Sequence, residues 1–506
     1  MKNMPFLHLR LSAWKVLTAI VAALFVLFAC QKDETETKKT EFHSLEDFKG
    51  YKACVVAGSV QDISISEVIP EKDILRISSL AEDFASVQSG TADFAAFDTI
   101  CLIGVDLQQR GLEMALAMED FKSMAAAFRF EDKQLCSQFN TFLSEIKANG
   151  IYDSIIKRWT SGDIEKATMP KIDMPKTGTP IRVGTMGSDF PATFIKDGKW
   201  AGFETELIYR FAQYINRPVE LYDYEFGALI AALNTKKVDA IFATMCVTEE
   251  RAKSVLFSDP YYFTRTVIIK RTDNAVAQTK VSFGEKLKTS FRRNLIEEDR
   301  WKLIAEGLGE TLFISVFAIL LGIIVGALIC AMRMSRSKVL RGTAIAYVEI
   351  MRGVPILVFL MIMFYIVFAT SRVTATWVAI FAFALNFGAY VSEMFRTGIE
   401  GVDKGQIEAG RAMGFSSYGT FVNFVMPQAL KSIFPVFKGE AVSLIKNTSV
   451  VGYIAIQDLT KASDLIRSRT FDAFFPLIVI TIIYFLLAWL LGLLLEKLAN
   501  RSPRRS

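Results

Sequence analysis

Three long stretches of the chain carry no charged residue, and they limit the possible folds more than any other feature. They run from Leu312 to Met332, Val373 to Val391 and Phe474 to Leu495. Each is close to the roughly 20 apolar residues that a helix needs to cross a bilayer. Apolar residues make up 52% of the 506-residue chain, a high share for a soluble protein. The C-terminal part is therefore predicted to lie in a membrane.

Two further apolar stretches contain or border charged residues. Val354 to Ala369 follows a segment with a glutamate, and Ser432 to Ile456 carries Lys438, Glu440 and Lys446. Charged groups inside a membrane face other helices or an aqueous path. We therefore expect five spans in total, two of which face other helices rather than lipid.

Basic residues predict how these spans are oriented, because Lys and Arg in short loops stay on the cytoplasmic side. They follow the first, third and last of the five expected spans: Arg333, Arg336, Lys338, Arg341, Arg396, Lys404, Arg411, Lys497, Arg501, Arg504 and Arg505. The segment before Leu312 is then expected outside the cytoplasm of a bacterial inner membrane. The net charge of +5 reflects this topology and does not indicate a nucleic-acid partner.

The N-terminus has the pattern of an export signal. Basic residues precede an apolar stretch from Val16 to Ala29, and Cys30 and a polar run follow. The sequence resembles a lipoprotein signal over residues 1–30, with lipidation at Cys30 and a polar linker over 31–42. Phe28 is bulkier than usual there, so an uncleaved anchor is the alternative.

Cysteine and histidine usage argues against metal sites and histidine-based catalysis. The six cysteines show no CxxC or metal-ligand spacing, and the chain has two histidines. No cofactor is expected, and the chain is not expected to be an enzyme. The cysteines of the exported region could form disulfides, without a preferred pairing: Cys54, Cys101, Cys136 and Cys246.

Residues 43–274 alternate strand-like apolar runs, such as ADFAAF and VDAIFAT, with helical patterns. Alternation of this kind predicts α/β lobes. Ligands of such lobes lie beyond the carboxyl ends of the strands. The expected fold is therefore an α/β two-lobed clamshell followed by an all-α domain of five transmembrane helices.

Residues 180–274 closely resemble the first lobe of the polar amino-acid-binding proteins that serve ABC importers. The matches are IRVGTMGSDFPATF, DGKWAGFETELIYRFA, FGALIAALNTKKVDAIFATMCVTEERA and VLFSDPYY. The resemblance implies that Arg251, in a T-x-x-R step from Thr248, grips the substrate carboxylate, as a bidentate guanidinium can. It also places Thr244 and Cys246 at the ligand and Phe190 over it. Cys246 departs from the usual serine or threonine, and a thiol is a weak partner for an ammonium group.

Residues 43–160 resemble the second lobe of the same proteins, followed by their C-terminal helices. In SLEDFKGYKACVVAGSVQD, Gly58 and Ser59 are expected to offer N–H groups to a carboxylate. In QSGTADFAAFD, Asp98 matches the aspartate that takes the substrate ammonium. Viewed singly, Asp98 could instead be a helix N-cap, Arg251 a surface residue and Phe190 a core aromatic.

The order of the lobes is reversed relative to the family. The second lobe comes first and is joined to the first lobe through a linker over 161–179. Each lobe signature occurs once, and chain termini that lie close together allow such a short connection. We therefore expect one circularly permuted clamshell with free ends near the crossing between the lobes, followed by a linker over 275–302.

One stretch of the C-terminal region, residues 303–500, resembles the cytoplasmic coupling loop of a bacterial ABC importer permease. It has an E-A-x4-G-x12-P arrangement, formed by Glu408, Ala409, Gly414 and Pro427. Such a loop needs a short amphipathic helix, small residues for close approach, including Gly410, and a turn at each end. An ordinary amphipathic helix beside a membrane is the alternative.

Other segments of this region resemble the same permeases, including GETLFISV and MRGVPILVFLMIMFY. For Arg352 and Glu393, structural ion pairs are favoured over a transport role. No G-x-x-x-x-G-K-[ST] phosphate loop occurs, so the resemblance implies a separate ATPase subunit. It also implies a permease homodimer and ATP-driven import of a polar amino acid that binds at Arg251, Asp98 and Phe190.

Two other classes of protein stay open: an amino-acid-gated channel and an amino-acid sensor. A channel of the clamshell type places its pore between the lobes, whereas both lobes here precede every span. A channel or sensor has no use for the loop at Glu408. The sequence does not indicate which amino acid is bound, and glutamine, glutamate, arginine and histidine are all compatible.

Overall fold

The computed structural model describes residues 42–501, except 78–79, 162–163, 273–282, 370, 372 and 473. The expected signal over 1–30, the lipidation site Cys30 and nearly all of the 31–42 linker lie outside the described residues. So does the first part of the linker that precedes the C-terminal domain. The description below concerns the unit from Ser44 onward.

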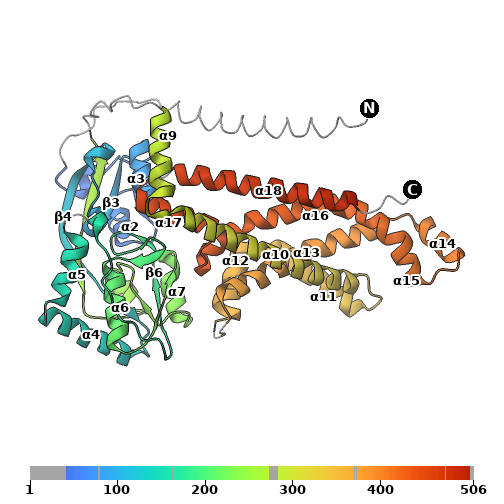
Figure 1. The fold of residues 1–506 in the computed structure, drawn as a ribbon, viewed down its shortest axis with the longest axis horizontal. Coiled ribbons are helices and arrows are strands. Elements are labelled where there is room, and N and C mark those ends of the chain that lie inside the picture. Colours follow the sequence, from blue (N-terminus) through green and yellow to red (C-terminus); the bar gives the residue numbers. More distant parts are fainter. Residues whose placement is uncertain are drawn as a thin grey trace. The chain divides into compact units, whose positions relative to one another are not determined.

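The first of two lobes, called lobe A, is built on a five-stranded sheet in the order β2-β1-β3-β13-β4 (Figure 1). The strands β1, β2 and β3 are parallel, and β13 is antiparallel to both β3 and β4. The buried run Phe94–Phe97 of β3 fits this central position, because a strand covered on both faces is apolar throughout. Its elements are β1 (Ala53–Val56), α2 (Val60–Ser66), β2 (Ile74–Ile77), α3 (Leu80–Ser89), β3 (Phe94–Asp98), β4 (Leu112–Met124) and β13 (Tyr262–Arg271).

The second lobe, called lobe B, has a five-stranded sheet in the order β10-β6-β11-β5-β12 and a small sheet β7-β8-β9. Its strands are β5 (Ala127–Phe128), β6 (Ile181–Thr185), β7 (Ser188–Asp189), β8 (Thr193–Lys196), β9 (Lys199–Ala201), β10 (Val219–Asp223), β11 (Ala240–Ile241) and β12 (Leu256–Phe257). Its helices are α4 (Lys133–Ala148), α5 (Ile151–Thr160), α6 (Phe203–Tyr214), α7 (Leu229–Asn234) and α8 (Glu249–Ala252).

A buried glutamate fastens α5 to lobe B. The Glu206 carboxylate on α6 accepts hydrogen bonds from Trp159 Nε1 at 2.8 Å and Arg158 Nη1 at 2.7 Å. Arg210 Nη2 donates to the same carboxylate at 2.8 Å. Because the Glu206 side chain is fully buried, its charge requires these partners. The helices α4 and α5, which follow β5, therefore belong to lobe B, although the strands before β5 belong to lobe A.

Two neighbouring segments connect the lobes. The chain passes from β4 to β5 through Met124–Ala127 and returns from β12 to β13 through Ser258–Tyr261. The backbone N–H of Tyr261 donates to Met124 O at 3.0 Å, and that of Ser258 donates to Ala126 O at 2.9 Å. The chain thus enters and leaves the two-lobed part in lobe A.

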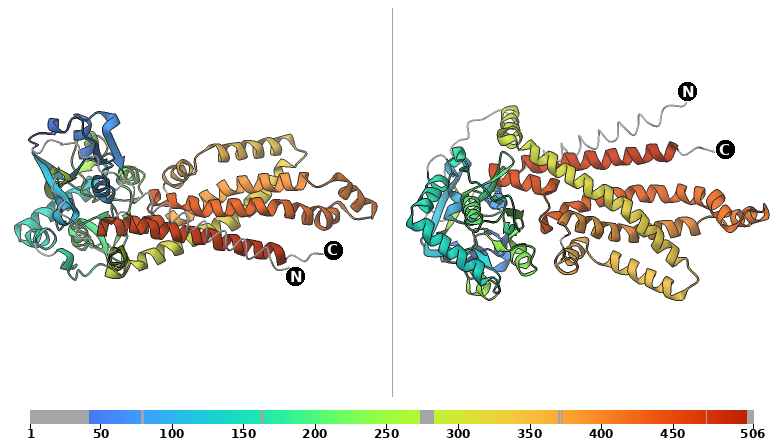
Figure 2. Two further views of the ribbon diagram at one scale, coloured as in Figure 1. Left: turned by 90° about the horizontal axis from the view of Figure 1, so that it is seen from above. Right: turned by 60° about the horizontal axis from the view of Figure 1, so that its bottom comes forward.

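The rest of the described chain is helical. Figure 2 shows its long helices α10, α13 and α16 side by side, in agreement with Figure 1. The helices are α9 (Phe283–Phe291), α10 (Trp301–Arg333), α11 (Lys338–Gly353), α12 (Ile356–Ile362), α13 (Ala375–Glu400), α14 (Lys404–Ala412), α15 (Ser417–Thr420), α16 (Met426–Asn447), α17 (Leu459–Thr470) and α18 (Phe475–Arg501).

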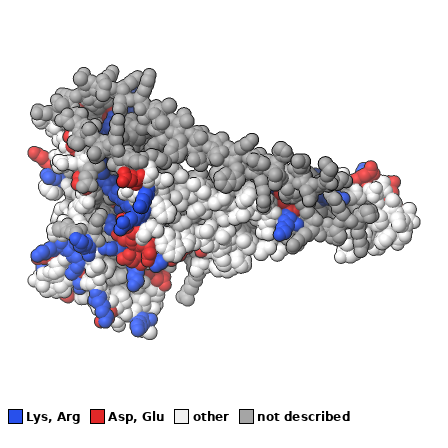
Figure 3. Space-filling model, turned by 45° about the horizontal axis from the view of Figure 1, so that its top comes forward, with Lys and Arg blue, Asp and Glu red and all other residues white. Residues whose placement is uncertain are grey.

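Among the described residues, three helices are long and apolar enough to cross a membrane: Trp301–Arg333, Ala375–Glu400 and Phe475–Lys497. A fourth candidate is the pair Lys338–Gly353 and Ile356–Val367, bent by 110°. The bend lies at Pro355, which disfavours a continuous helix through its own position and the residue before it. On the face drawn in Figure 3, charged side chains gather mainly on the part that holds the sheets, and the helical part is mostly uncharged.

Glycines allow α10 and α13 to approach closely. A Cβ atom on Gly326 would lie 2.5 Å from Val391 Cγ1, and one on Gly388 would lie 2.7 Å from Val325 Cγ1. Small residues at a helix interface permit this backbone approach inside a membrane. The two longest membrane-type helices before the loop at Glu408 are thus tightly packed on one another.

The four cysteines of the exported region form no disulfide among the described residues. Cys54, Cys101, Cys136 and Cys246 are buried and free, as is Cys330. The possibility of disulfides that the sequence left open is therefore not realised in this structure.

Candidate functional site

A small cavity of about 60 Å³ lies between the lobes, near the carboxyl ends of their parallel strands. Five of the predicted binding residues line it: Ser59, Asp98, Thr244, Cys246 and Arg251. The remaining lining residues are Val56, Val60, Gln61, Leu80, Ala96, Phe97 and Cys101 of lobe A, and Met186, Asp189 and Phe226 of lobe B. Residues far apart in the sequence therefore meet at one polar cleft.

Arg251 is held in place from both lobes. Its Nη1 donates to the carbonyl of Cys246 at 2.7 Å in lobe B, and its Nη2 donates to the carbonyl of Gly58 at 2.8 Å in lobe A. The guanidinium also lies over the Phe226 ring, 5.0 Å from the centroid. Thr248 caps α8 by accepting a hydrogen bond from the Arg251 N–H at 3.2 Å, so it positions Arg251 and does not line the cavity.

Asp98 ends β3 and faces Arg251 across the cavity lining. It precedes a short 3-10 helix, but its side chain does not cap that helix. Its Oδ1 atom is buried without a hydrogen-bond partner among the described residues. Burial, reinforced by the nearby Asp189 carboxylate, raises the pKa of Asp98 to about 7. A buried carboxylate of this kind is suited to accept a cationic group from a ligand.

Two acidic residues that were not predicted from the sequence lie beside Thr244. The Thr244 hydroxyl donates to Asp189 Oδ2 at 2.5 Å, and its backbone N–H donates to Glu204 Oε1 at 2.7 Å. Burial raises the pKa of Asp189 to about 6 and that of Glu204 to about 7. Thr244 has a φ of +46°, a conformation that is costly for a β-branched residue. Asp189 comes just after the turn that follows the strand β6. Because binding residues lie beyond the ends of such strands, this position in the sequence could have identified Asp189 as a site residue.

Phe190 does not line the cavity. Its ring packs against Phe194 at 4.9 Å and under the guanidinium of Arg469, 4.6 Å from the centroid. The aromatic residue at the cavity is Phe226, which lies in the segment FGALIAALN and was not singled out from the sequence. A resemblance in one stretch does not determine which of two nearby aromatics the tertiary fold turns toward the cleft.

The N–H groups of Gly58 and Ser59 are already used within lobe A. The Gly58 N–H donates to Asp62 Oδ2 at 2.9 Å, and the Ser59 N–H donates to Val56 O at 3.1 Å. Ser59 also caps α2, accepting from the Asp62 N–H at 3.0 Å. Both groups are therefore engaged in this structure, and the expectation that they offer free donors to a carboxylate does not fit it. The side chain of Ser59 still lines the cavity.

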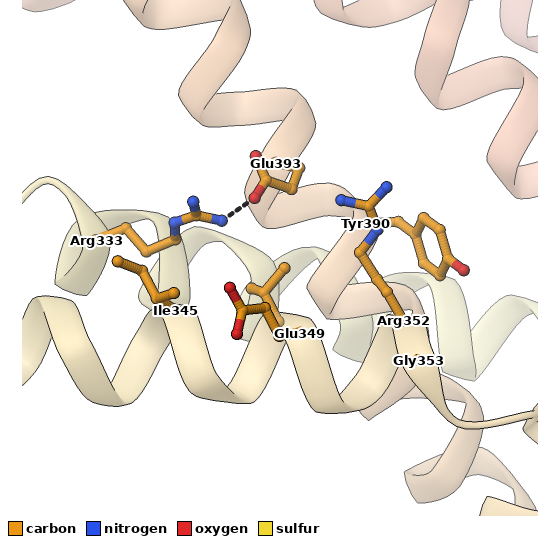
Figure 4. A pocket seen from close by; sticks show the side chains of 8 residues that line it. Arg333, Ile345, Glu349, Arg352, Gly353, Tyr390 and Glu393 are labelled. Atoms are coloured by element: carbon orange, nitrogen blue, oxygen red, sulfur yellow. Dashed lines mark hydrogen bonds and ion pairs between the residues drawn. The ribbon is translucent and has the colours of Figure 1, made fainter.

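Two larger cavities lie among the helices and share Arg352, Gly353 and Tyr390. One has a volume of about 460 Å³ and the other of about 500 Å³. Figure 4 shows the first, with Glu349 and Arg352 on α11 facing Tyr390 and Glu393 on α13. The second is lined in part by polar side chains of α13 and α16: Asn386, Glu440, Ser443 and Asn447.

For Arg352 and Glu393 the sequence favoured structural ion pairs, and the two residues differ in the structure. Glu393 pairs with Arg333 and, at 2.9 Å, with Arg396 Nη2. Arg352 forms no ion pair among the described residues and lies over Tyr390, 5.4 Å from the ring centroid. Only Glu393 therefore fits the structural assignment, and Arg352 remains available to both cavities.

The segment around Glu408 folds as a short capped helix. Asp403 begins α14, and its Oδ1 accepts from the Gly405 N–H at 2.6 Å. Gly414 ends the turn with a φ of +83°, which glycine adopts without strain. Glu408 and Ala409 are exposed.

Close packing and exposed apolar side chains complete this segment. Gly410 packs so closely that a Cβ would lie 2.8 Å from Thr420 Cγ2. Pro427 lies in the first turn of α16. On either side of Gly414, Met413 and Tyr418 are 68% and 78% exposed, which leaves an apolar surface beside Glu408 that is suited to a protein partner.

Comparison with known proteins gives a match to a family of binding proteins and matches to transport permeases. The family described as bacterial extracellular solute-binding proteins, family 3, matches residues 181–434. The "Putative glutamine transport system permease protein GlnP" of Rickettsia bellii is 35% identical over 194 residues, which is 37% of this chain and 88% of that protein. The "L-cystine transport system permease protein TcyB" of Bacillus subtilis is 32% identical over 221 residues, 43% of this chain and 94% of that protein.

Among solved structures, the "Crystal structure of an amino acid ABC transporter with histidines" is 32% identical in sequence. The match covers 44% of this chain and 99% of the solved chain, with a TM-score of 0.38.

Proposed function

Since the chain belongs to family 3 of the bacterial extracellular solute-binding proteins and to the permeases of amino-acid ABC transporters, we propose that it captures and imports polar amino acids. Capture takes place in the two-lobed part on the extracytoplasmic side of the inner membrane. Passage takes place through the helical part and is driven by a separate ATPase subunit. One observation carries the proposal: the cavity between the lobes brings Arg251 and Asp98 together from opposite sides.

These two groups match the two charges of an amino acid backbone. The Arg251 guanidinium would bind the carboxylate in a bidentate manner, and Asp98 would accept the ammonium, which supplies the missing partner of its buried Oδ1. Thr244 and Ser59 add hydroxyls, and Cys246 adds a thiol, to the same wall. With the backbone charges matched, Asp189 remains for the substrate side chain, which favours an amino acid whose side chain donates hydrogen bonds or is cationic.

The two-lobed part is proposed to be a circularly permuted clamshell. The first segment, 43–160, supplies most of lobe A, and the second, 180–274, supplies most of lobe B. Each segment also completes the other lobe, since β5, α4 and α5 join lobe B and β13 joins lobe A. Both ends of the clamshell then lie in lobe A, from which one leads to the N-terminal anchor and the other to α10.

The helical part is proposed to contain five spans, with α16 as the fourth. Its charged residue Glu440 lines the cavity around Arg352, and Lys438 pairs with Glu496 on α18, so both would face protein and not lipid. That cavity is large enough for an amino acid and is the proposed path between the two sides of the membrane. The exposed surface of α14, with Glu408 and Ala409, would contact the ATPase.

The proposed assembly is a homodimer of this chain on an ATPase dimer, tied to the membrane at the N-terminus through a lipid on Cys30 or an uncleaved anchor. Tethering keeps the receptor near the permease at an effective concentration of roughly millimolar. An amino-acid-gated channel or a sensor is the alternative. The exposed capped helix at Glu408 favours the importer, because neither alternative needs a surface for an ATPase.

Calorimetric titration of the purified full-length chain with each of the twenty amino acids tests capture. Stoichiometric binding of a polar amino acid, lost in Arg251→Ala, is the expected result. Vesicles containing the chain and its ATPase then test import with Glu408→Lys and Gly414→Val. Binding without import in these variants supports the importer, whereas unchanged import would contradict the assignment of the coupling loop.

A further inference from the structure

The helix α17, between α16 and α18, contacts both lobes through buried cations. Arg467 Nη1 and Nη2 each lie 3.2 Å from Glu82 Oε1 on α3 of lobe A. Lys461 Nζ lies 2.8 Å from Glu225 Oε1 and 3.4 Å from Asp223 Oδ1 in lobe B. Lys461 and Arg467 are 4% and 5% exposed. Charges this buried are strongly disfavoured without a partner, so these ion pairs differ from incidental surface pairs.

The same helix is fixed to two of the proposed membrane spans. The backbone N–H of Leu459 donates to Thr311 Oγ1 on α10 at 3.2 Å. Tyr484 on α18 donates to Asp458 Oδ2, which caps α17, at 3.1 Å. A Cβ on Gly307 of α10 would lie 2.6 Å from Asp458 O. A displacement of α17 would therefore displace α10 or α18 with it.

A short path leads from α17 to the cavity between the lobes. Met186 lines that cavity, and the next residue, Gly187, donates its N–H to Asp223 Oδ1 at 2.9 Å. Asp223 in turn pairs with Lys461. A Cβ on Gly187 would lie 2.9 Å from Asp223 Oδ2 and 3.1 Å from Leu465 Cδ2 on α17. The cavity wall and the helical part are thus in direct contact at this turn.

We propose that α17 is the surface by which the helical part recognises the closed form of the two-lobed part. Arg467 binds lobe A and Lys461 binds lobe B, and both cations contact lobe carboxylates together only at the lobe separation seen here. When lobe A swings away, Arg467 keeps only Asp464 of its own helix, at 2.9 Å. When lobe B swings away, Lys461 loses its two lobe carboxylates, and either loss disfavours docking of the open form. This inference rests on the proposed function.

Docking and ligand binding are then linked. A ligand that favours closure favours docking on α17, and docking increases ligand affinity by the same factor. Loss of either contact of α17 should weaken ligand binding as well as import, although α17 does not line the cavity.

Charge exchange at the pair Arg467 and Glu82 tests the proposal in the full-length chain. Arg467→Glu and Glu82→Arg should each raise the dissociation constant for the amino acid and lower uptake by about tenfold. The double variant should return both quantities to within about twofold of the unmodified chain, since two independent lesions would instead add. The exchange of Lys49 and Glu46, an exposed pair in lobe A, is the control and should change neither.

A milder variant tests the turn at the cavity wall. Gly187→Ala should lower uptake several-fold, because the new methyl group pushes against Asp223 and Leu465. Gly227→Ala is the matched control, since a Cβ at Gly227 meets no atom within 4 Å. Equal uptake by the two alanine variants would count against the path through Gly187.

The outcomes separate this inference from the proposed function. If the unmodified chain binds no amino acid, the proposed function fails. If it binds and imports, but the single charge variants match it or the double variant is as defective as the singles, only the role of α17 is overturned.

Discussion

The Arg251 guanidinium in lobe B donates a hydrogen bond to the backbone carbonyl of Gly58 in lobe A, 2.8 Å away. The residue that is proposed to bind the substrate carboxylate therefore also joins the lobes. A second N–H of the same group is engaged by the Cys246 carbonyl. The guanidinium of arginine carries several N–H donors, so it can join the lobes and bind a carboxylate at the same time. A single ammonium group could not do both.

Arg251→Lys is accordingly expected to weaken amino-acid binding despite the retained charge. A lysine cannot bind both lobe carbonyls and a bidentate carboxylate, so affinity should fall by roughly 30-fold or more, or about 2 kcal/mol. Calorimetry on the full-length chain measures this. Arg265→Lys, outside the cavity lining, is the control. An affinity within twofold of the unmodified chain for both lysine variants would contradict the role of Arg251.

Binding should strengthen as pH rises from 5 to 7.5. The pKa of Asp98 is raised to about 7 in the empty cavity, chiefly by burial, so the group is protonated at pH 5. An ammonium ligand needs the ionised form, and binding then lowers this pKa and releases a proton. We expect affinity to increase by up to about 75-fold over this range, because the ionised fraction of a group with a pKa of about 7 rises from about 1% to about 75%. Asp98→Asn should weaken binding and flatten the dependence; an unchanged slope in that variant would assign the titration to another group.

Asp83 should destabilise the folded chain increasingly as pH rises. Its carboxylate is fully buried on α3, beside the Cys54 thiol, and burial raises its pKa well above the usual value. In the unfolded chain it ionises near about pH 4, so its contribution to stability falls from there upward. Asp83→Asn should match the unmodified chain in thermal stability at pH 4 and exceed it at pH 8. A constant difference across this range would contradict the raised pKa.

Gly307→Ala should disturb the contact between α10 and α17. The added methyl group would lie 2.6 Å from Asp458 O and 2.9 Å from Leu459 N, and backbone atoms cannot give way as a flexible side chain can. Uptake and thermal stability should both fall, the latter by about 1–3 kcal/mol in unfolding free energy. Gly309→Ala lies on the same helix in open space and is the matched control. Equal melting temperatures for the two variants would show that the contact can relax.

Local sequence patterns pointed to several residues of the cavity lining. The T-x-x-R step led us to expect Thr248 and Arg251 at the ligand; in the structure Arg251 lines the cavity, whereas Thr248 caps α8. Asp98 and Cys246 reached the cavity because each follows a buried strand, and strand ends meet at one edge of a sheet. The exposed helix at Glu408 likewise has its cap at Asp403 and its glycine turn at Gly414.

The sequence alone determined the features that are encoded by residues close together in the chain. These are the uncharged stretches of membrane length, the caps, the turns and the strand ends that carry polar groups. Only the tertiary structure decided that Phe226, not Phe190, lies at the cavity. It also decided that Arg251 reaches Gly58 and that Arg467 reaches Glu82, 385 positions earlier. The physical reason is that such contacts depend on how separate elements pack against each other. The residues next to each partner in the sequence therefore do not reveal a contact with a residue hundreds of positions away.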